Sequence, residues 1–128
     1  MYATKLFISS VFCCLTCMIN AQKVAPEISE GFKSGNGVVI GKYFAETVDV
    51  YVAGSAKTNL TKTLAIAELN QFFKNFPTKN FSIIHNGERD NSCYVIGKLI
   101  SSEEFRVTIF LKKFGNNYLI NQVKIEKG

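Results

Sequence analysis

Histidine, tryptophan and proline are scarce: the 128 residues include one histidine, no tryptophan and two prolines. A single histidine, His85, excludes the metal motifs that need two histidines, and with them most zinc sites. With 47% hydrophobic residues and nine glycines, the composition excludes disordered, collagen-like and low-complexity chains. The length excludes a multidomain enzyme with a separate cofactor domain, because one domain usually takes about 100–150 residues. We therefore expect one small domain without a metal site.

Residues 1–21 have the layout of a secretory signal peptide. Lys5 supplies the positive charge, an uncharged apolar segment covers residues 6–19, and Ala21 is a small residue at the cleavage position. The apolar segment is shorter than the roughly twenty residues that a membrane span needs. We expect no integral membrane span, export to the periplasm or beyond, cleavage after Ala21, and one domain over residues 22–128.

Cleavage would leave a single cysteine, Cys93, because Cys13, Cys14 and Cys17 all lie in the removed segment. One cysteine cannot form an intramolecular disulfide, so the core alone has to stabilise the exported domain. Leu15-Thr16-Cys17 is one residue short of a lipid-attachment pattern, and lipidation is therefore not expected.

The net charge is +5, and it falls to +4 when Lys5 is removed. The longest basic run is Lys112-Lys113, whereas a nucleic-acid-binding protein would need a clustered basic face. The positive charge is spread along the chain, which is typical of a solubilising surface. No nucleic-acid partner is expected.

The hydrophobic pattern predicts three helices. Pro26 suits the first position of a helix, which Gly35 ends in a left-handed conformation. Asn36 caps a short second helix, and Thr61 caps a long third helix that runs to about Phe76. The inner face of the second helix is Ile40, Tyr43 and Phe44, and the apolar stripe of the third is Ala65, Leu69, Phe72 and Phe76.

Alternating apolar residues predict strands over Thr47–Val52, Phe81–His85, Cys93–Ile100, Phe105–Lys112 and Tyr118–Ile125. Residues 54–59 are predicted to be a polar loop, and residues 86–91 a polar turn. Successive strands joined by short turns pair antiparallel. The predicted fold class is α+β: a strongly bent antiparallel sheet, made of a four-stranded meander plus one N-terminal strand, with three helices packed on its concave face.

This order of elements resembles the nuclear-transport-factor-2-like superfamily, an α+β cone. In detail the chain resembles a bacterial family of exported proteins, domain of unknown function 4783. The segments that carry the resemblance are Ser34-Gly35-Asn36, Lys42-Tyr43-Phe44, Phe72-Phe73, Phe81-Ser82-Ile83-Ile84-His85, Tyr94-Val95-Ile96-Gly97, Phe105-Arg106-Val107 and Val123-Lys124-Ile125-Glu126. They span most of residues 25–126, and they imply a fold and a bacterial source but no activity.

In related cone-shaped enzymes, an aspartate and a histidine meet inside the cone and move a proton. The resemblance therefore makes Asp49 and His85 candidate catalytic residues, with Tyr43, Tyr51 and Tyr94 as candidate hydrogen-bond donors or ligand-binding residues. The simpler interpretation of Asp49 is an exposed aspartate on a strand.

Two further patterns in the sequence are candidates for chemistry. His85 and Cys93 would face each other as a nucleophilic pair if the turn between their strands were centred near Arg89. A lone cysteine is more often a small buried hydrophobic residue. The glycines of residues 35–41 are spaced one residue too widely for a dinucleotide-binding loop, and no strand precedes them, so no cofactor is expected.

These observations favour a non-enzymatic exported module that binds a small apolar or amphipathic ligand, or a protein partner. The alternative is a small acid–base enzyme of isomerase or dehydratase type that uses Asp49 and His85. An enclosed pocket holding both side chains would favour the enzyme. A cone filled by phenylalanines would leave no room for a substrate; the candidates are Phe32, Phe44, Phe72 and Phe76.

The sheet has two faces, and the helices can cover only one of them. Alternation assigns Phe105, Val107, Ile109 and Leu111 to the core and leaves Phe110 on the outside. In the neighbouring predicted strand, Cys93–Ile100, apolar residues point to both faces of the sheet. We therefore expect an apolar patch on the uncovered face. We expect a homodimer through that face, as the superfamily resemblance also implies.

Overall fold

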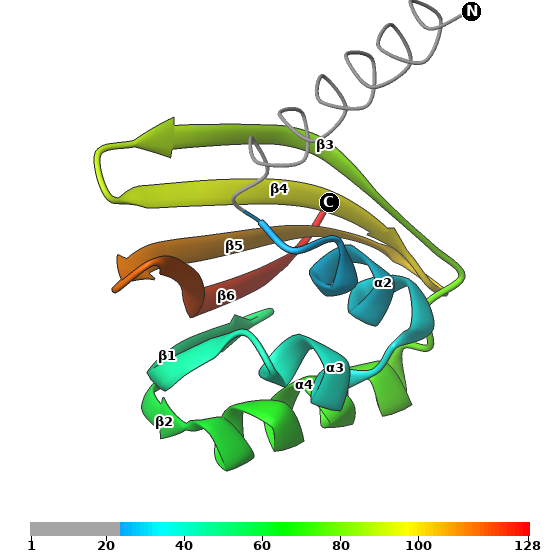
Figure 1. The fold of residues 1–128 in the computed structure, drawn as a ribbon. Coiled ribbons are helices and arrows are strands. Elements are labelled where there is room, and N and C mark those ends of the chain that lie inside the picture. Colours follow the sequence, from blue (N-terminus) through cyan, green and yellow to red (C-terminus); the bar gives the residue numbers. More distant parts are fainter. Residues whose placement is uncertain (1–23) are drawn as a thin grey trace, which may run out of the picture.

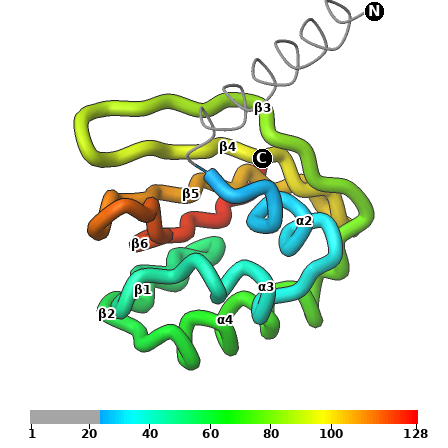
Figure 2. The backbone as a smooth tube through the Cα atoms, viewed as in Figure 1, coloured from blue at the N-terminus to red at the C-terminus, as the bar shows by residue number. Residues whose placement is uncertain are grey.

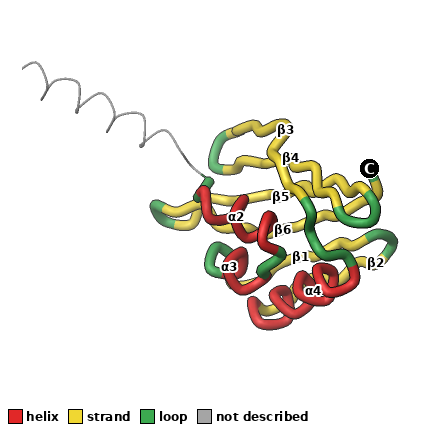
Figure 3. The backbone as a smooth tube through the Cα atoms, turned by 90° about the vertical axis from the view of Figure 1, so that its right-hand side faces the viewer, coloured by secondary structure: helices red, strands yellow, loops and turns green. Residues whose placement is uncertain are grey.

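The computed structural model describes residues 24–128, so the predicted signal peptide and its cleavage site lie outside the described residues. The helices are α2 (Pro26–Ser34), α3 (Gly37–Gly41) and α4 (Lys62–Asn75). The strands are β1 (Phe44–Val52), β2 (Ser55–Thr61), β3 (Asn80–Arg89), β4 (Ser92–Ile100), β5 (Glu104–Phe114) and β6 (Asn117–Lys127). The three described helices lie on one side of a curved sheet (Figures 1 and 3).

The strands form one six-stranded sheet in the order β2-β1-β6-β5-β4-β3. The four-stranded meander from β3 to β6 is antiparallel throughout, as the sequence predicts. The N-terminal strand β1 instead runs parallel to β6, the last strand (Figure 2). The α+β class is confirmed, but the sheet is mixed and six-stranded rather than antiparallel and five-stranded.

The sixth strand, β2, occupies most of the segment predicted to be a polar loop. A tight turn with positive φ at Ala53 (32°) and Gly54 (91°) reverses the chain after β1, and β2 pairs back onto it. Every side chain of β2 except Leu60 is exposed. Backbone hydrogen bonds, rather than alternating burial, hold this strand in place, so the hydrophobic pattern could not reveal it.

The second helix is shorter than predicted, because α3 ends at Gly41 and Phe44 already belongs to β1. The backbone carbonyl of Tyr43 accepts a hydrogen bond of 2.6 Å from the Ile120 amide of β6. This long-range contact draws the chain into the sheet where local sequence alone favours another helical turn.

Strand β3 is longer than the sequence predicts, since it continues through the predicted turn to Arg89. Only Asp90 and Asn91 make the turn to β4, and Asp90 has a positive φ of 53°. A β-bulge interrupts the pairing, since Ile83 lies opposite Gly97 but His85 lies opposite Ile96. Ile84 is the extra residue, and the bulge shifts the register of everything after it.

The predicted caps are confirmed at each helix. Gly35 ends α2 with a φ of 64°, and the Asn36 side chain accepts hydrogen bonds from the amides of Val38 and Val39 at 3.0 and 3.3 Å. The Thr61 hydroxyl accepts a hydrogen bond of 3.4 Å from the Leu64 amide at the start of α4. These caps fix the entry points of the helices that cover the sheet.

Phenylalanine rings fill the space between helices and sheet. Phe32 of α2 stacks on Phe81 of β3 with ring centroids 5.0 Å apart, and Phe72 of α4 meets Phe105 of β5 edge-on at 5.0 Å. Phe44 is fully buried as well. The predicted stripe of α4 therefore faces the sheet, and the centre of the cone is packed with side chains.

Candidate functional site

A cavity of about 620 Å³ opens on the concave side of the sheet, between α2 and the β3–β4 hairpin. We call it the α2–β3 groove. Its apolar lining comes from the chain around α2 and from three strands: Val24, Ala25, Pro26, Ile28, Phe81, Ile83, Cys93, Val95 and Ile109. Polar side chains are distributed around the same groove: Ser29, Glu30, Lys33, Asn86 and Glu88. An apolar space with a few polar groups is typical of a small-molecule site.

The groove lies beside the packed centre of the cone. Phe32, Phe44 and Phe72 are at most 3% exposed, and the half-buried Phe76 packs on Phe105 with centroids 4.9 Å apart. The phenylalanines thus close the interior that an enclosed active site would need. The groove remains open because β3 and β4 extend past the short helix α2.

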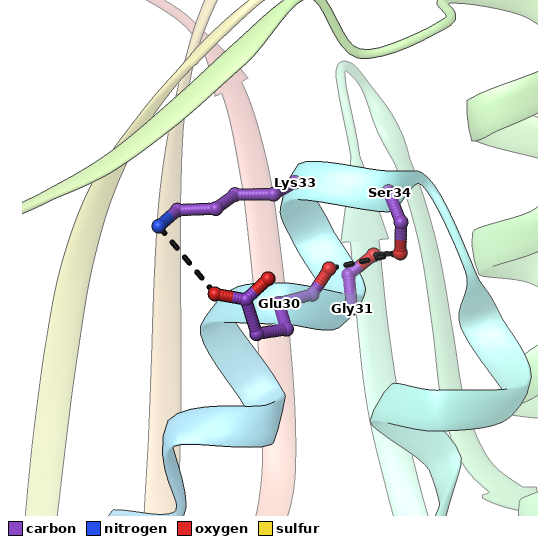
Figure 4. A network of polar contacts seen from close by, with 4 residues as sticks. All are labelled: Glu30, Gly31, Lys33 and Ser34. Carbon is purple, nitrogen blue, oxygen red and sulfur yellow. Dashed lines mark hydrogen bonds and ion pairs between the residues drawn. The ribbon is translucent and has the colours of Figure 1, made fainter.

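The polar side of the groove includes an ion pair within α2 (Figure 4). Lys33 Nζ lies 3.6 Å from Glu30 Oε1, and the Ser34 hydroxyl donates a hydrogen bond of 2.8 Å to the Glu30 carbonyl. Both charged side chains are more than half exposed, so the pair contributes little to stability. Both charges therefore remain accessible to the polar end of a ligand.

Tyr43, a candidate donor, lies at the junction of α3 and β1. Its hydroxyl donates a hydrogen bond to the Glu27 carboxylate in the first turn of α2. This hydrogen bond is the main reason that the pKa of Tyr43 is raised, and burial and the Glu27 charge act in the same direction. Tyr43 does not line the groove, and its contact ties α2 to the start of the sheet.

The structure does not bring Asp49 and His85 together. Asp49 lies on β1, where its Oδ1 accepts a hydrogen bond of 2.8 Å from the Asn59 amide of β2. His85 lies on β3, four strand positions away across the sheet. At about 4.8 Å per strand, the two strands are roughly 19 Å apart. Asp49 serves the β1–β2 pairing, and the predicted proton-transfer pair is not formed.

His85 and Cys93 do not face each other, because the condition for that arrangement, a turn centred near Arg89, is not met. The turn is centred between Asp90 and Asn91, and with the bulge at Ile84 it places His85 opposite Ile96. Cys93 lies opposite Glu88 and points into the core, where it is 6% exposed.

His85 instead contacts Tyr94. Its Nε2 lies 3.0 Å from the Tyr94 hydroxyl, on the sheet face away from the helices. Tyr51 lies on the same face, opposite Lys124 of β6. Of the five candidates, the sheet joins only His85 and Tyr94. Only Tyr94 also borders the groove, at its position on β4 between the inward-facing Cys93 and Val95.

Most of the groove residues carry no pattern in the sequence that marks them as functional. Asn86 and Glu88 belong to a segment predicted to be a turn, and Ser29 is one polar residue on an amphipathic helix. Their shared position depends on the length of β3 and on the direction of α2.

Within residues 24–128, no group of three or more His, Cys, Asp and Glu side chains is placed to hold a metal ion. No helix in that range has the length and apolar character to cross a membrane.

The face of the sheet away from the helices carries the predicted apolar residues. Phe110 is 38% exposed there, opposite Tyr94 on one side and Gln122 on the other. Ile96 and Thr108 form the next pair of this face and are half-buried. We call these five residues the outer patch. The outward orientation of Phe110 is confirmed.

The curved sheet, the helices on its concave side and the groove beside the packed cone define a nuclear-transport-factor-2-like α+β fold. A solved structure of an NTF2-like protein of unknown function from Shewanella baltica has this fold, with a TM-score of 0.62 and 9% identity over 80% of this chain and 86% of that one. Residues 25–126 match the family described as Domain of unknown function (DUF4783), and the chain belongs to that family.

Two solved DUF4783 proteins are similar over nearly their whole length. The protein from Bacteroides ovatus is 36% identical, with a TM-score of 0.80 over 84% of this chain and 98% of that one. The protein from Bacteroides uniformis is 33% identical, with a TM-score of 0.78 over 82% and 97%. None of the curated proteins matches the chain.

Proposed function

We propose that this protein is an exported, non-enzymatic module that binds a small amphipathic ligand in the α2–β3 groove. The groove itself carries the proposal: its volume of about 620 Å³ lies within the roughly 300–1,000 Å³ of ligand pockets. The alternative acid–base function has no matching geometry, because Asp49 and His85 lie on separate strands and outside the groove.

The lining indicates what kind of ligand fits. Among the apolar lining residues, Val24, Pro26 and Ile83 keep exposed surface, and burying that surface against the body of a ligand is favourable. Glu30 and Lys33 lie at the groove as an exposed pair of opposite charges. A ligand with an apolar body and one charged or hydrogen-bonding end would contact both regions.

A fluorescent apolar probe tests the site in the mature protein. We expect 1-anilinonaphthalene-8-sulfonate to bind with increased fluorescence, and Ser29→Phe to weaken that binding at least tenfold because the ring would enter the groove. Thr63→Phe is the control, since Thr63 is exposed on α4 and does not line the groove. Equal binding by both variants would exclude the groove as the site.

We propose in addition that two copies of the chain contact each other through the outer patch. The exposed ring of Phe110 lies beside the half-buried Tyr94 and Ile96 on a sheet face that the helices leave uncovered. Apolar surface gathered in this way is typical of an interaction surface. A twofold contact would bury the patch on both copies. We expect Phe110→Lys to halve the molar mass in light scattering, and Leu64→Lys, on the exposed side of α4, to leave it unchanged. A mass that Phe110→Lys does not alter would contradict this contact.

A further inference from the structure

The outer edge of β3 is a separate surface, and it pairs with no other strand among residues 24–128. β3 is the last strand in the sheet order and pairs only with β4 (Figures 1 and 3). Proteins usually protect such edges with charged side chains or proline. From residue 81 to residue 87 this edge has neither, and Ile83 and Ile84 are 44% and 60% exposed.

We propose that β3 pairs with β3 of a second copy of this chain, antiparallel, around a twofold axis between Ile83 and Ile84. Opposite residues of an antiparallel pair have to point to the same face of the sheet. In a regular strand, an axis between two residues would break this rule, because it sets an inward residue against an outward one. The bulge at Ile84 exchanges inward and outward positions for the residues that follow it. An axis between Ile83 and Ile84 therefore sets inward residues against inward ones and outward residues against outward ones.

The faces of β3 agree with this register. Phe81 and Asn86 both line the groove on the helix side, and the axis sets them opposite each other. Ser82 lies opposite Lys98 and His85 lies opposite Ile96, both outward positions of β4, and the axis pairs Ser82 with His85. Each pair therefore shares a face across the proposed seam.

The charges of the edge are self-complementary in the same register. Lys79, one residue before β3, comes opposite Glu88 of the second copy, and symmetry produces this opposite-charge pair twice. Ile83 comes opposite Ile84 of the second copy, so the most exposed apolar residues of the edge cover each other. Moving the axis by one residue would instead set Ile83 against Asn86.

The proposed pairing of two β3 strands would also change the wall of the α2–β3 groove. Ile83 lines that groove, and the second copy would place its Ile84 beside it. The edge contact would thus extend the apolar wall of each groove with a residue from the other copy. It uses none of the outer patch, so the two contacts can be tested one at a time.

The first test is light scattering in the Phe110→Lys background, which removes the proposed contact through the outer patch. With both contacts present the wild type would be a tetramer, so the halved mass of Phe110→Lys is that of a dimer. We expect the added substitution Ile84→Lys to halve the mass again, because it places two ammonium groups at the axis. Val38→Lys is the matched control, since Val38 is 57% exposed on α3. Circular dichroism verifies that each variant is folded. A monomeric Phe110→Lys variant, or a dimer that survives Ile84→Lys, would overturn the proposal.

Disulfide cross-linking tests the register. In the same background, Ser82→Cys combined with His85→Cys is expected to give a covalent dimer under mild oxidation. Within one chain the two positions are about 8–10 Å apart along the strand, too far for a disulfide, so the link has to join two copies. Ser82→Cys alone is expected to stay monomeric on a non-reducing gel. Equal cross-linking by both variants, or none by the double variant, would contradict the register, whatever the outcome of the probe-binding test.

Discussion

Phe72 shows at the scale of one residue how α4 is held on the sheet. Its side chain is 3% exposed, and its ring packs edge-on against Phe105. We expect Phe72→Ala to lower the free energy of unfolding by about 3–5 kcal/mol, because apolar contacts are lost and a cavity remains. Leu64→Ala, at an exposed position of the same helix, should change it by less than about 0.5 kcal/mol in urea unfolding. Similar losses for both would mean that α4 does not face the sheet through Phe72.

Tyr43 makes part of the stability depend on pH. Its pKa is raised in the folded protein, chiefly by the hydrogen bond to Glu27, so the fold favours the protonated phenol. This contribution is complete below the ordinary tyrosine pKa of about 10 and is lost as the pH rises through the folded pKa. We expect Tyr43→Phe to be less stable than the wild type near pH 8, and the difference to shrink near pH 11. A difference that stays constant over this range would refute the role of the phenol proton.

Individual residues also show what alternation in a sequence can and cannot predict. The outward position of Phe110 and the buried position of Ile109 follow from a period of two. The partner of His85 does not, because it depends on where the turn is centred and on one bulged residue. A shift of one position exchanges the two faces of a strand, and residues 86–91 contain both Asn-Gly and Asp-Asn, each suited to a turn.

At the scale of elements, β3 and β4 approach each other closely at Gly97. A Cβ atom at this position would lie 2.5 Å from Cε1 of Phe81, whose ring is buried and stacked on Phe32. We expect Gly97→Ala to destabilise the protein by about 1–3 kcal/mol, because the ring has no space to move. Ser82→Ala, on the exposed side of β3, is the control and should stay within about 0.5 kcal/mol. Thermal unfolding of the two variants measures the difference, and an unchanged Gly97→Ala variant would mean that the ring can shift.

The elements that were predicted well are those that bury an apolar stripe. α4 and β5 each present such a stripe to the core, and both were found from the sequence. β2 and the last part of β3 are exposed on almost every side chain. They are held at the edges by backbone pairing, which leaves no periodic signal. The groove is formed in part by this last part of β3. For that reason the sequence did not predict most of the groove residues as functional.

At the scale of the whole molecule, the parallel pairing of β1 with β6 joins segments near the two ends of the described chain (Figure 2). Val50 lies opposite Val123 in this pair, with most of the domain between them in sequence. Such pairing depends on the path of all the intervening elements rather than on local propensity. The sequence therefore predicted the α+β class and the meander, but not the mixed sheet.

Export is a proposal about the whole chain, and its test is the mass of the protein from its native host. We expect a chain that begins at Gln22 in the envelope or the medium, because the pattern of residues 1–21 favours cleavage after Ala21. Replacing Ala21 with a large charged residue, Ala21→Arg, should leave the precursor uncleaved. A protein that keeps residues 1–21, or one that begins at Cys13, Cys14 or Cys17 with attached lipid, would contradict the proposal.

Ligand binding in the α2–β3 groove is the central claim, and native mass spectrometry of the exported protein tests it most directly. We predict that the wild-type protein carries an adduct of constant mass, that Thr63→Phe retains it, and that Ser29→Phe loses it because the new ring fills the groove. A wild-type protein without any adduct, or an adduct that persists in Ser29→Phe, would contradict the claim.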